Sequence, residues 1–297
     1  MKIAFIGLGQ MGKGMALNML KSGAEMIVCA TRDRYFQEFT SRGAKATTKL
    51  ADTAEADIIF LCLPGAPEVK SVICMEPIFP LLRKGQIVVD FSTINYKVSL
   101  EIARLLEEKG VYFIDAPISG LEQRANDGTL TVMCGGDEKA FESVKSYLDF
   151  VGNKILYMGG PGKGQLTKLI NQLLLNINMA ALAEVLPMAV KLGLDCEKVG
   201  EVINSSTGGS NVSKTFIPRI LERNFFGGGL KMNLAYKDMI SVSEITSEFA
   251  IPMPVLGAAT STYQMAMRNG FGECDKGGMV QVFENLLGVS YQKNSKR

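Results

Sequence analysis

A lysine and two side-chain amides stand at helical spacing near the start of the longest apolar segment of the chain. Lys168, Asn171 and Gln172 lie at positions i, i+3 and i+4, so an α-helix places their side chains on one face. Leucine and isoleucine fill most neighbouring positions, and a helix that is apolar nearly all round is typical of burial between two domains. We therefore expect a buried polar trio. The alternative for Lys168 is an amine that reaches solvent from the end of a core helix.

The chain contains no histidine, so a proton donor near neutral pH must be another group. When a hydride reduces a carbonyl, the developing alkoxide must receive a proton, and the donor works best with a pKa near the working pH. Free lysine titrates at ~10.4, so burial or a second cation must lower the pKa of a catalytic lysine. Lys237, in the segment LAYKDM, is the candidate for that second cation. Its alternative is an ordinary solvated helix face, because Asp238 follows it.

A glycine-rich loop near the N-terminus predicts a dinucleotide site. Gly7, Gly9 and Gly12 have GxGxxG spacing, directly after a predicted strand and at the start of a predicted helix. Such glycines form the tight turn, admit the pyrophosphate and let the helix pack closely on the strand. The helix N-terminus then offers unpaired N–H groups to the phosphates. The predicted binding loop comprises Gly7, Leu8, Gly9, Gln10, Met11 and Gly12.

The end of the second predicted strand favours NADP over NAD. NAD enzymes place an acid about 20 residues past the fingerprint, where it binds the ribose 2′-OH. Here that position reads Ala30 or Thr31, and Arg32 and Arg34 can pair with a 2′-phosphate. Asp33 competes as the missing acid, but it precedes a helical pattern and we interpret it as an N-cap. The alternative for the arginines is a solvated turn.

Length and composition restrict the function further. With 297 residues the chain exceeds the size of one efficient core, so we expect two domains. A net charge of +2, with both signs interspersed, argues against a nucleic-acid partner. Six cysteines without a CxxC pair, in a chain without histidine, predict buried thiols and no metal site. We see neither a signal sequence nor an apolar run of membrane-spanning length, and expect a cytoplasmic protein.

Periodicity divides the chain into an α/β part and a helical part. Short β-rich runs that alternate with helical patterns predict a mainly parallel sheet covered by helices on both faces. We expect strands at 3–6, 26–29, 57–63, 86–91, 111–116 and 129–136, and helices at 10–22, 33–42, 97–109 and 137–149. After a turn cluster at 159–164 we expect helices at 164–193, 195–205, 213–223, 230–249, 254–269 and 276–287, and a frayed tail from 291.

Four segments together resemble the β-hydroxyacid dehydrogenase family, which includes 3-hydroxyisobutyrate dehydrogenase, over nearly the whole chain. They are GLGQMGKGMALNML at 7–20, DAPISGLEQRANDGTLTVMCGG at 115–136, GKGQLTKLINQ at 162–172 and LAYKDM at 234–239. The resemblance implies a doubly wound sheet of Rossmann type, related to that of 6-phosphogluconate dehydrogenase, followed by an all-α domain. We place the NAD(P)-binding Rossmann domain at 1–161 and the all-helical substrate and oligomerisation domain at 162–297, with catalysis in a cleft between them.

The resemblance also implies roles for individual residues. Lys168 takes the position of the family's general acid/base, with Asn171 and Gln172 as its orienting partners. Ser119 and Gly120 fall on the stretch that anchors the substrate carboxylate. The positions that match those lining the cofactor are Thr31, Arg32, Leu63, Pro64, Thr93 and Lys237, besides the glycine-rich loop, and Lys237 also adds positive charge for the substrate.

Three departures from the family pattern concern the substrate pocket. The family usually has a second glycine after Ser-Gly, where this chain has Leu121, a bulky side chain beside the expected carboxylate. An asparagine usually stands four places after the lysine, where this chain has the longer Gln172. An aromatic residue is common seven places before the second lysine, at Leu230 here. None of these changes touches the hydride chemistry.

Our leading hypothesis is an oxidoreductase that interconverts a small 3-hydroxy acid and its semialdehyde or aldehyde, with NADP favoured over NAD. Two alternatives remain open. Imine reductases share this architecture but commonly have another residue in place of Lys168, and a cofactor-binding sensor or interaction protein would have lost the chemistry. We expect a small carboxylate-bearing substrate and neither nucleic acid nor membrane as a partner. Apolar residues of the predicted helices at 254–269 and 276–287 favour a homodimer or homotetramer.

Overall fold

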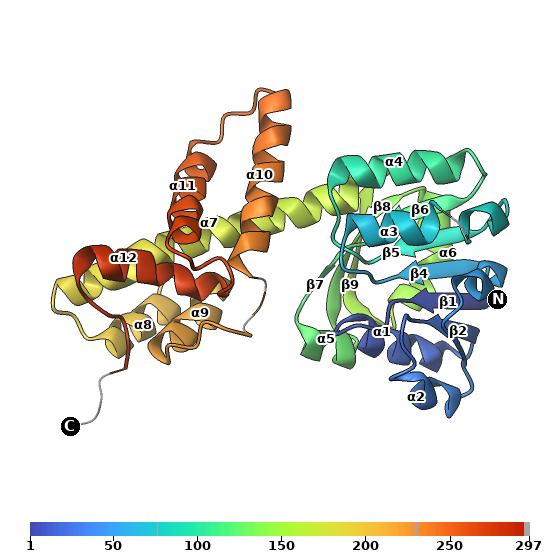
Figure 1. Ribbon diagram of the computed structural model, residues 1–297, viewed down its shortest axis with the longest axis horizontal. Helices are drawn as coiled ribbons and strands as arrows, with labels where there is room; N and C mark the ends of the chain where they lie inside the picture. Colours follow the sequence, from blue (N-terminus) through green and yellow to red (C-terminus); the bar gives the residue numbers. More distant parts are fainter. Residues whose placement is uncertain (76, 228, 230, 294–297) are drawn as a thin grey trace. The chain divides into compact units, whose positions relative to one another are not determined.

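The chain folds into two compact units, Met1–Lys168 and Leu169–Arg297 (Figure 1). The computed structural model describes residues 1–75, 77–227, 229 and 231–293. Each unit has its own hydrophobic core, so each is described by itself. The first unit is the α/β part of the chain and the second is entirely helical in its described residues.

The first unit is built on a nine-stranded sheet with the order β3-β2-β1-β4-β5-β6-β8-β7, and β9 pairs with β8. The strands are β1 (Lys2–Ile6), β2 (Glu25–Cys29), β3 (Lys45–Thr47), β4 (Ile58–Leu61), β5 (Ile87–Asp90), β6 (Tyr112–Asp115), β7 (Ile118–Ser119), β8 (Leu130–Gly136) and β9 (Gly152–Gly159). Strands β1 to β6 are parallel, whereas β8 runs antiparallel to β6 and β7. The order in which strands are added to the sheet reverses between β1 and β4, which is the topological switch point where such sheets bind ligands.

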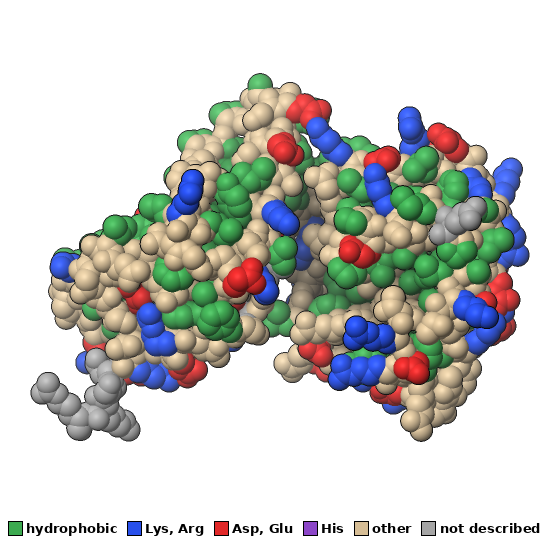
Figure 2. All heavy atoms as spheres, in the orientation of Figure 1, with side chains coloured by type: hydrophobic (Ala, Val, Ile, Leu, Met, Phe, Trp, Pro, Cys, Tyr) green, Lys and Arg blue, Asp and Glu red, His purple; other side chains and the backbone are tan. Residues whose placement is uncertain are grey.

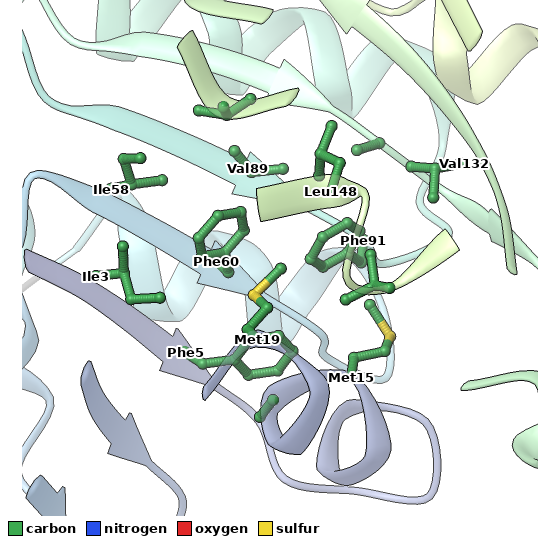
Figure 3. Packing of buried hydrophobic residues seen from close by; sticks show 14 of the residues in the cluster. Ile3, Phe5, Met15, Met19, Ile58, Phe60, Val89, Phe91, Val132 and Leu148 are labelled. Atoms are coloured by element: carbon green, nitrogen blue, oxygen red, sulfur yellow. The ribbon is translucent and has the colours of Figure 1, made fainter. Parts of the chain in front are cut away.

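Helices cover both faces of this sheet. The helices of the first unit are α1 (Gly12–Met19), α2 (Phe36–Thr40), α3 (Ala66–Ile73), α4 (Tyr96–Glu107), α5 (Glu122–Asp127) and α6 (Glu138–Leu148). Helices α1, α5 and α6 pack on one face, where Phe5, Phe60 and Phe91 stack with ring centroids 5.8 to 6.4 Å apart (Figure 3). Helices α3 and α4 cover the other face. The Rossmann-type doubly wound sheet predicted from the sequence is confirmed.

The second unit packs helices around one core. Its helices are the greater part of α7 (Lys163–Lys191), then α8 (Cys196–Ser205), α9 (Asn211–Leu221), α10 (Met232–Glu248), α11 (Pro254–Arg268) and α12 (Val280–Leu287). Helices α10 and α11 form an antiparallel pair in Figure 1, and the buried Met239 and Tyr263 come one from each. Tyr263 is fully buried. The all-helical second domain expected from the sequence is confirmed.

Helix α7 is long and apolar enough to cross a membrane by length and composition alone. Half of its most apolar window is buried inside the protein, as in the core helix of a globular domain. Ile170 and Leu174 are nevertheless 68% and 61% exposed, so the expectation of a helix buried on every side is wrong for the single chain.

Several details of the sequence-based expectation need correction. Strands β3, β7 and β9 and helices α3 and α5 were not predicted, because they are short or lack clear periodicity. The segment 276–287 begins as a 3₁₀ turn before α12. The tail is not frayed at Tyr291, whose hydroxyl donates a 2.6 Å hydrogen bond to the Cys196 carbonyl. Met279 and Val280 lie in the core of the second unit, so they do not form the surplus apolar surface expected of them.

Candidate active site

The glycine-rich loop has the geometry of a dinucleotide cradle. Gly7 has φ +100°, and a Cβ there would lie 2.2 Å from the Cys62 carbonyl oxygen. A Cβ at Gly12 would lie 2.0 Å from the Gly7 carbonyl oxygen, so only glycine lets α1 start so close to β1. No described atom lies within 4 Å of a Cβ at Gly9, so packing within the chain does not explain this glycine. The close approach of a pyrophosphate, which the dinucleotide fold places at this position, does explain it.

The other residues of the loop differ in what they present. Leu8 is 5% exposed, and its side chain packs in the core on the sheet face that α1, α5 and α6 cover, so only its backbone faces outward. Met11 also packs against that core and occupies the N-cap position of α1. Gln10 is exposed and donates a 2.8 Å hydrogen bond from Nε2 to Oε2 of Glu122. The loop is therefore tied to α5 by a side-chain contact.

Two further loops leave the same edge of the sheet. Leu63 and Pro64 follow β4, and a Leu63 methyl would lie 3.0 Å from a Cβ at Gly7. The Leu63 N–H donates to the Ser92 hydroxyl over 2.9 Å, which joins this loop to the one after β5. Thr93 follows Ser92 and is exposed. The structure thus brings Leu63 and Gly7 together at the switch point.

The segment that follows β2 is exposed. Thr31 and Arg32 are both exposed there. The interpretation of Asp33 as a helix N-cap is wrong, because α2 starts at Phe36 and its N-cap residue is Tyr35, with no side-chain cap. Arg34 lies over the Tyr35 ring, 5.1 Å from its centroid. The Tyr35 ring thus contacts Arg34, and Arg32 lies three residues after Cys29, the last residue of β2.

The predicted substrate-anchoring stretch lies on β7. Ser119 pairs with Thr131 of β8 and is half-buried. Gly120 has φ +145°, and a Cβ there would lie 2.6 Å from a Leu130 methyl, so the position requires glycine. Leu121 is 64% exposed and directly precedes α5. Its side chain therefore stands in solvent beside the anchoring backbone and is not packed into the core.

Helix α5 docks this stretch against the cofactor loop. Asn18 of α1 donates from Nδ2 to the carbonyl oxygens of Ala125 and Asn126, both over 3.0 Å. A Cβ at Gly14 would lie 2.3 Å from the Asn126 amide oxygen, so the two helices are in close contact. The helix that carries the phosphate-binding N-terminus thus also holds the segment that follows Ser119.

Helix α7 carries the proposed catalytic lysine in its second turn. Lys168 is 9% exposed, in agreement with the expectation of burial. Asn171 is exposed and Gln172 is half-buried, so the expectation that all three side chains are buried is wrong. The Asn171 amide nitrogen lies 3.5 Å from the Gln172 amide oxygen. The side of α7 that bears Ile170 and Asn171 is uncovered in the single chain, which explains the difference.

Asp115 holds the N-terminus of α7. Its Oδ1 accepts the Gly162 N–H over 2.7 Å and its Oδ2 accepts the Gln165 N–H over 2.8 Å. Gln165 is 2% exposed; its Oε1 accepts the Ile94 N–H and its Nε2 donates to the Ser92 carbonyl. The first turn of α7 is therefore bonded both to β6 and to the loop after β5.

Asp90 and Asp115 are partners in the register of β5 and β6, and both are fully buried. Burial, reinforced by the neighbouring Asp115 and opposed by the Ser92 hydrogen bonds, raises the pKa of Asp90 to about 7. Burial also raises the pKa of Asp115, opposed by the backbone N–H groups at the start of α7. Asp90 Oδ2 has no hydrogen-bond partner among the described residues. We therefore assign the negative charge first to Asp115, which the helix N-terminus stabilises.

Lys237 is exposed on α10, between the buried Ala235 and Met239. Leu230, the departure that precedes it, lies outside the described residues. On the face shown in Figure 2, cationic and anionic side chains are interspersed, without a large patch of one sign. The described residues contain no cluster of metal-ligating side chains, and all six cysteines are free thiols.

Sequence reasoning missed Asp90, Asp115, Ser92 and Gln165. A signal was present, because the runs IVVD and YFID each end an apolar strand with an acid, and buried acids are rare. Their hydrogen-bond partners could not be predicted from the spacing of residues in the sequence, since Asp115 bonds to residues 47 and 50 positions away.

Comparisons with known proteins agree with this geometry. The profile of the NAD binding domain of 6-phosphogluconate dehydrogenase matches residues 2–159. The profile described as NAD-binding of NADP-dependent 3-hydroxyisobutyrate dehydrogenase matches residues 162–283.

Individual relatives match over nearly their full length. The chain is 35% identical to 2-(hydroxymethyl)glutarate dehydrogenase of Eubacterium barkeri, covering 97% of each protein. It is 33% identical to 2-hydroxy-3-oxopropionate reductase of Escherichia coli (strain K12), covering 96% of this chain and 97% of that one. The crystal structure of a 3-hydroxyisobutyrate dehydrogenase from Salmonella typhimurium superposes with a TM-score of 0.83 at 26% identity, covering 95% of this chain and 99% of that chain.

Proposed function

The chain belongs to the β-hydroxyacid dehydrogenase family, and we propose from this premise that it interconverts a small 3-hydroxy acid and its semialdehyde or aldehyde with a nicotinamide cofactor. The observation that carries the proposal is the buried lysine of α7, in a unit that also contains a complete dinucleotide loop and the Ser119–Gly120 anchor. The named relatives act on small hydroxy acids or their oxo counterparts, which supports this substrate class.

The nicotinamide cofactor, when bound, supplies or accepts the hydride. The backbone of the glycine-rich loop and the N-terminus of α1 would hold its phosphates, and Leu63, Pro64 and Thr93 would line the nicotinamide side. Lys168 donates a proton from Nζ to the oxygen of the reduced carbonyl and takes it back in the oxidative direction. Asn171 and Gln172, one turn further along α7, orient the lysine or the substrate.

Ser119 and Gly120 hold the substrate carboxylate with a hydroxyl and backbone N–H groups. The positive φ of Gly120 supports this role, because it turns the backbone amides in a way that a side chain would prevent. Leu121 adds an apolar side chain at the mouth of this anchor, and Lys237 contributes positive charge.

Replacing Lys168 tests the mechanism. Lys168→Ala removes the proton donor, so we expect kcat to fall by about 100-fold or more while NADPH binding is unchanged. Lys168→Arg is the matched control, because arginine keeps the positive charge but does not release a proton near neutral pH. Steady-state kinetics and fluorescence titration of NADPH give the two numbers. Near-normal turnover of either variant would remove Lys168 as the general acid.

The preference for NADP over NAD rests on Arg32. It is exposed at the end of β2, where NAD-specific enzymes have an acid, and arginine suits a 2′-phosphate. The match of residues 162–283 to an NADP-dependent enzyme supports the same choice. We expect Arg32→Ser to weaken NADPH binding by about tenfold, the effect of one lost charged hydrogen bond, and to leave NADH binding unchanged. Tighter binding of NADH than of NADPH by the unaltered protein would refute the preference.

Two alternatives are less well supported. An imine reductase commonly has another residue in place of Lys168, so assays with cyclic imines beside semialdehydes distinguish the two. A cofactor-binding sensor would show no oxidation of NADPH with any semialdehyde, although it would bind NADPH.

Assembly and location belong to the same proposal. Val185, Met188 and Leu192, at and just after the C-terminal end of α7, are 42 to 69% exposed, which supports a homodimer or homotetramer. The cytoplasm is the proposed location. Light scattering that gives the mass of one chain would contradict this assembly. We place the functional boundary at 161–162, so that α7 belongs to the substrate domain although Lys168 is the last residue of the first compact unit.

A further inference from the structure

We infer that Asp115 and Gln165 are positioning residues for Lys168. They bond the first turn of α7 to the two loops that carry the substrate anchor and the nicotinamide side of the site. The inference rests on the proposed function, because it explains how the lysine amine is held in place for proton transfer.

The Asp115 carboxylate is enclosed by backbone. It accepts N–H groups from Gly162 and Gln165, and a Cβ at Gly135 or Gly164 would lie 2.7 or 2.9 Å from its oxygens. A carboxylate with two oxygens accepts several N–H groups at once and complements the positive end of the helix. The fit is so close that neither a longer side chain nor a bulkier neighbour is accommodated.

The side chain of Gln165 makes a second attachment. Its Oε1 accepts the Ile94 N–H over 3.1 Å and its Nε2 donates to the Ser92 carbonyl over 2.8 Å. Ser92 in turn accepts the Leu63 N–H, so the loops after β4 and β5 are fixed to α7 through one amide side chain. Both attachments lie within the first unit.

The position of Lys168 follows from these bonds. Lys168 lies three residues after Gln165 on a continuous helix, so its Cα is about 5 Å further along the axis. Ser119 lies four residues after Asp115. The substrate anchor therefore lies four residues after Asp115, and the proton donor lies three residues after a residue that Asp115 binds.

Asp115→Asn tests the positioning role. Asparagine has the same shape but replaces one acceptor oxygen with a donor, which then faces a backbone N–H of α7. We expect kcat to fall by about tenfold or more, because a shift of about 1 Å in a catalytic group can cost up to 100-fold. The KM for NADPH should stay within about twofold, since the glycine-rich loop is untouched.

Asp137→Asn is the matched control. Asp137 caps α6 by accepting the Ala140 N–H over 2.8 Å, and α6 carries none of the proposed site residues. The same substitution at this second helix N-terminus should leave kcat unchanged. If Asp115→Asn does not fold, Gln165→Met carries the test, because methionine keeps the length and helix propensity but loses both hydrogen bonds.

Two measurements separate positioning from general stability. In the Lys168→Ala background, Asp115→Asn should lower kcat by no more than about twofold, because both changes remove the same step. Amide hydrogen exchange of residues 162–167 should be faster in Asp115→Asn than in the unaltered protein, and unchanged in Asp137→Asn.

The outcomes distinguish this inference from the proposed function. Normal turnover of Asp115→Asn beside a slow Lys168→Ala, additive losses in the double variant, or unchanged exchange at 162–167 would each overturn the positioning role alone. Normal turnover of Lys168→Ala would instead remove Lys168 as the general acid and, with it, the catalytic purpose of the two residues, whereas a lack of turnover by the unaltered protein with any semialdehyde would remove the proposed function.

Discussion

Asp90→Asn should become increasingly stabilising, relative to the unaltered protein, as the pH rises from about 4 to about 7, and its advantage should stay constant above that. Asp90 is fully buried and its pKa is raised from 3.8 to about 7 by that burial, so the native state keeps a proton that the unfolded chain releases. Below about pH 4 both states are protonated and the group costs nothing. Between pH 4 and pH 7 stability falls as pH rises, and above pH 7 the loss is complete.

The size of the expected change in unfolding free energy follows from the number of pH units over which Asp90 keeps its proton only in the native state. Each pKa unit corresponds to about 1.4 kcal/mol, so the two units between pH 5 and the folded-state pKa correspond to about 3 kcal/mol. Asparagine never ionises. Its Oδ1 can still accept the Ser92 N–H, which donates to Asp90 Oδ1 over 2.9 Å in the unaltered protein. The advantage of the variant over the unaltered protein should therefore grow by about 3 kcal/mol from pH 5 to pH 8.

Urea denaturation followed by circular dichroism at the two pH values measures this difference. Asp115 is present in both proteins, so its own titration largely cancels in the comparison. Equal m-values are required, because they show that the same surface is exposed on unfolding. A difference in unfolding free energy that is constant with pH, or a variant that is less stable at pH 8, would refute the assignment of a retained proton to Asp90.

The remaining predictions concern the cofactor loop and the second unit. Gly12→Ala should abolish NADPH binding and lower the melting temperature of the free protein, because its Cβ would lie 2.0 Å from a backbone oxygen. Gly9→Ala should weaken NADPH binding without changing that melting temperature. An equal fall of the melting temperature in the two variants would contradict the different roles of Gly9 and Gly12. Glu284→Gln should lower the unfolding free energy by about 3 kcal/mol, since Glu284 is buried and binds Arg223 over 2.5 and 2.9 Å and the Tyr291 N–H over 2.6 Å. Its NADPH affinity should not change.

Local patterns in the sequence determined the architecture. Alternating β runs and helical periods depend only on neighbours along the chain, so the long strands of the sheet and the helices of the second unit were predicted, whereas the elements without clear periodicity were missed. The three roles of Gly7, Gly9 and Gly12 were also predictable, because they depend on a backbone turn within six residues. Lys168 stood out because a cation in an apolar helix needs an explanation.

Only the tertiary structure decided how the site is held. Asp115 reaches the N-terminus of α7 across 47 and 50 residues, and the Gln165 amide reaches Ser92 across 73. The uneven burial of Lys168 and Asn171 likewise depends on which elements cover each side of α7. Spacing along a chain fixes which side chains share a helix face or a strand face. It does not fix which distant strand ends at that face, because this depends on the order of strands in the sheet and on the packing of the whole unit.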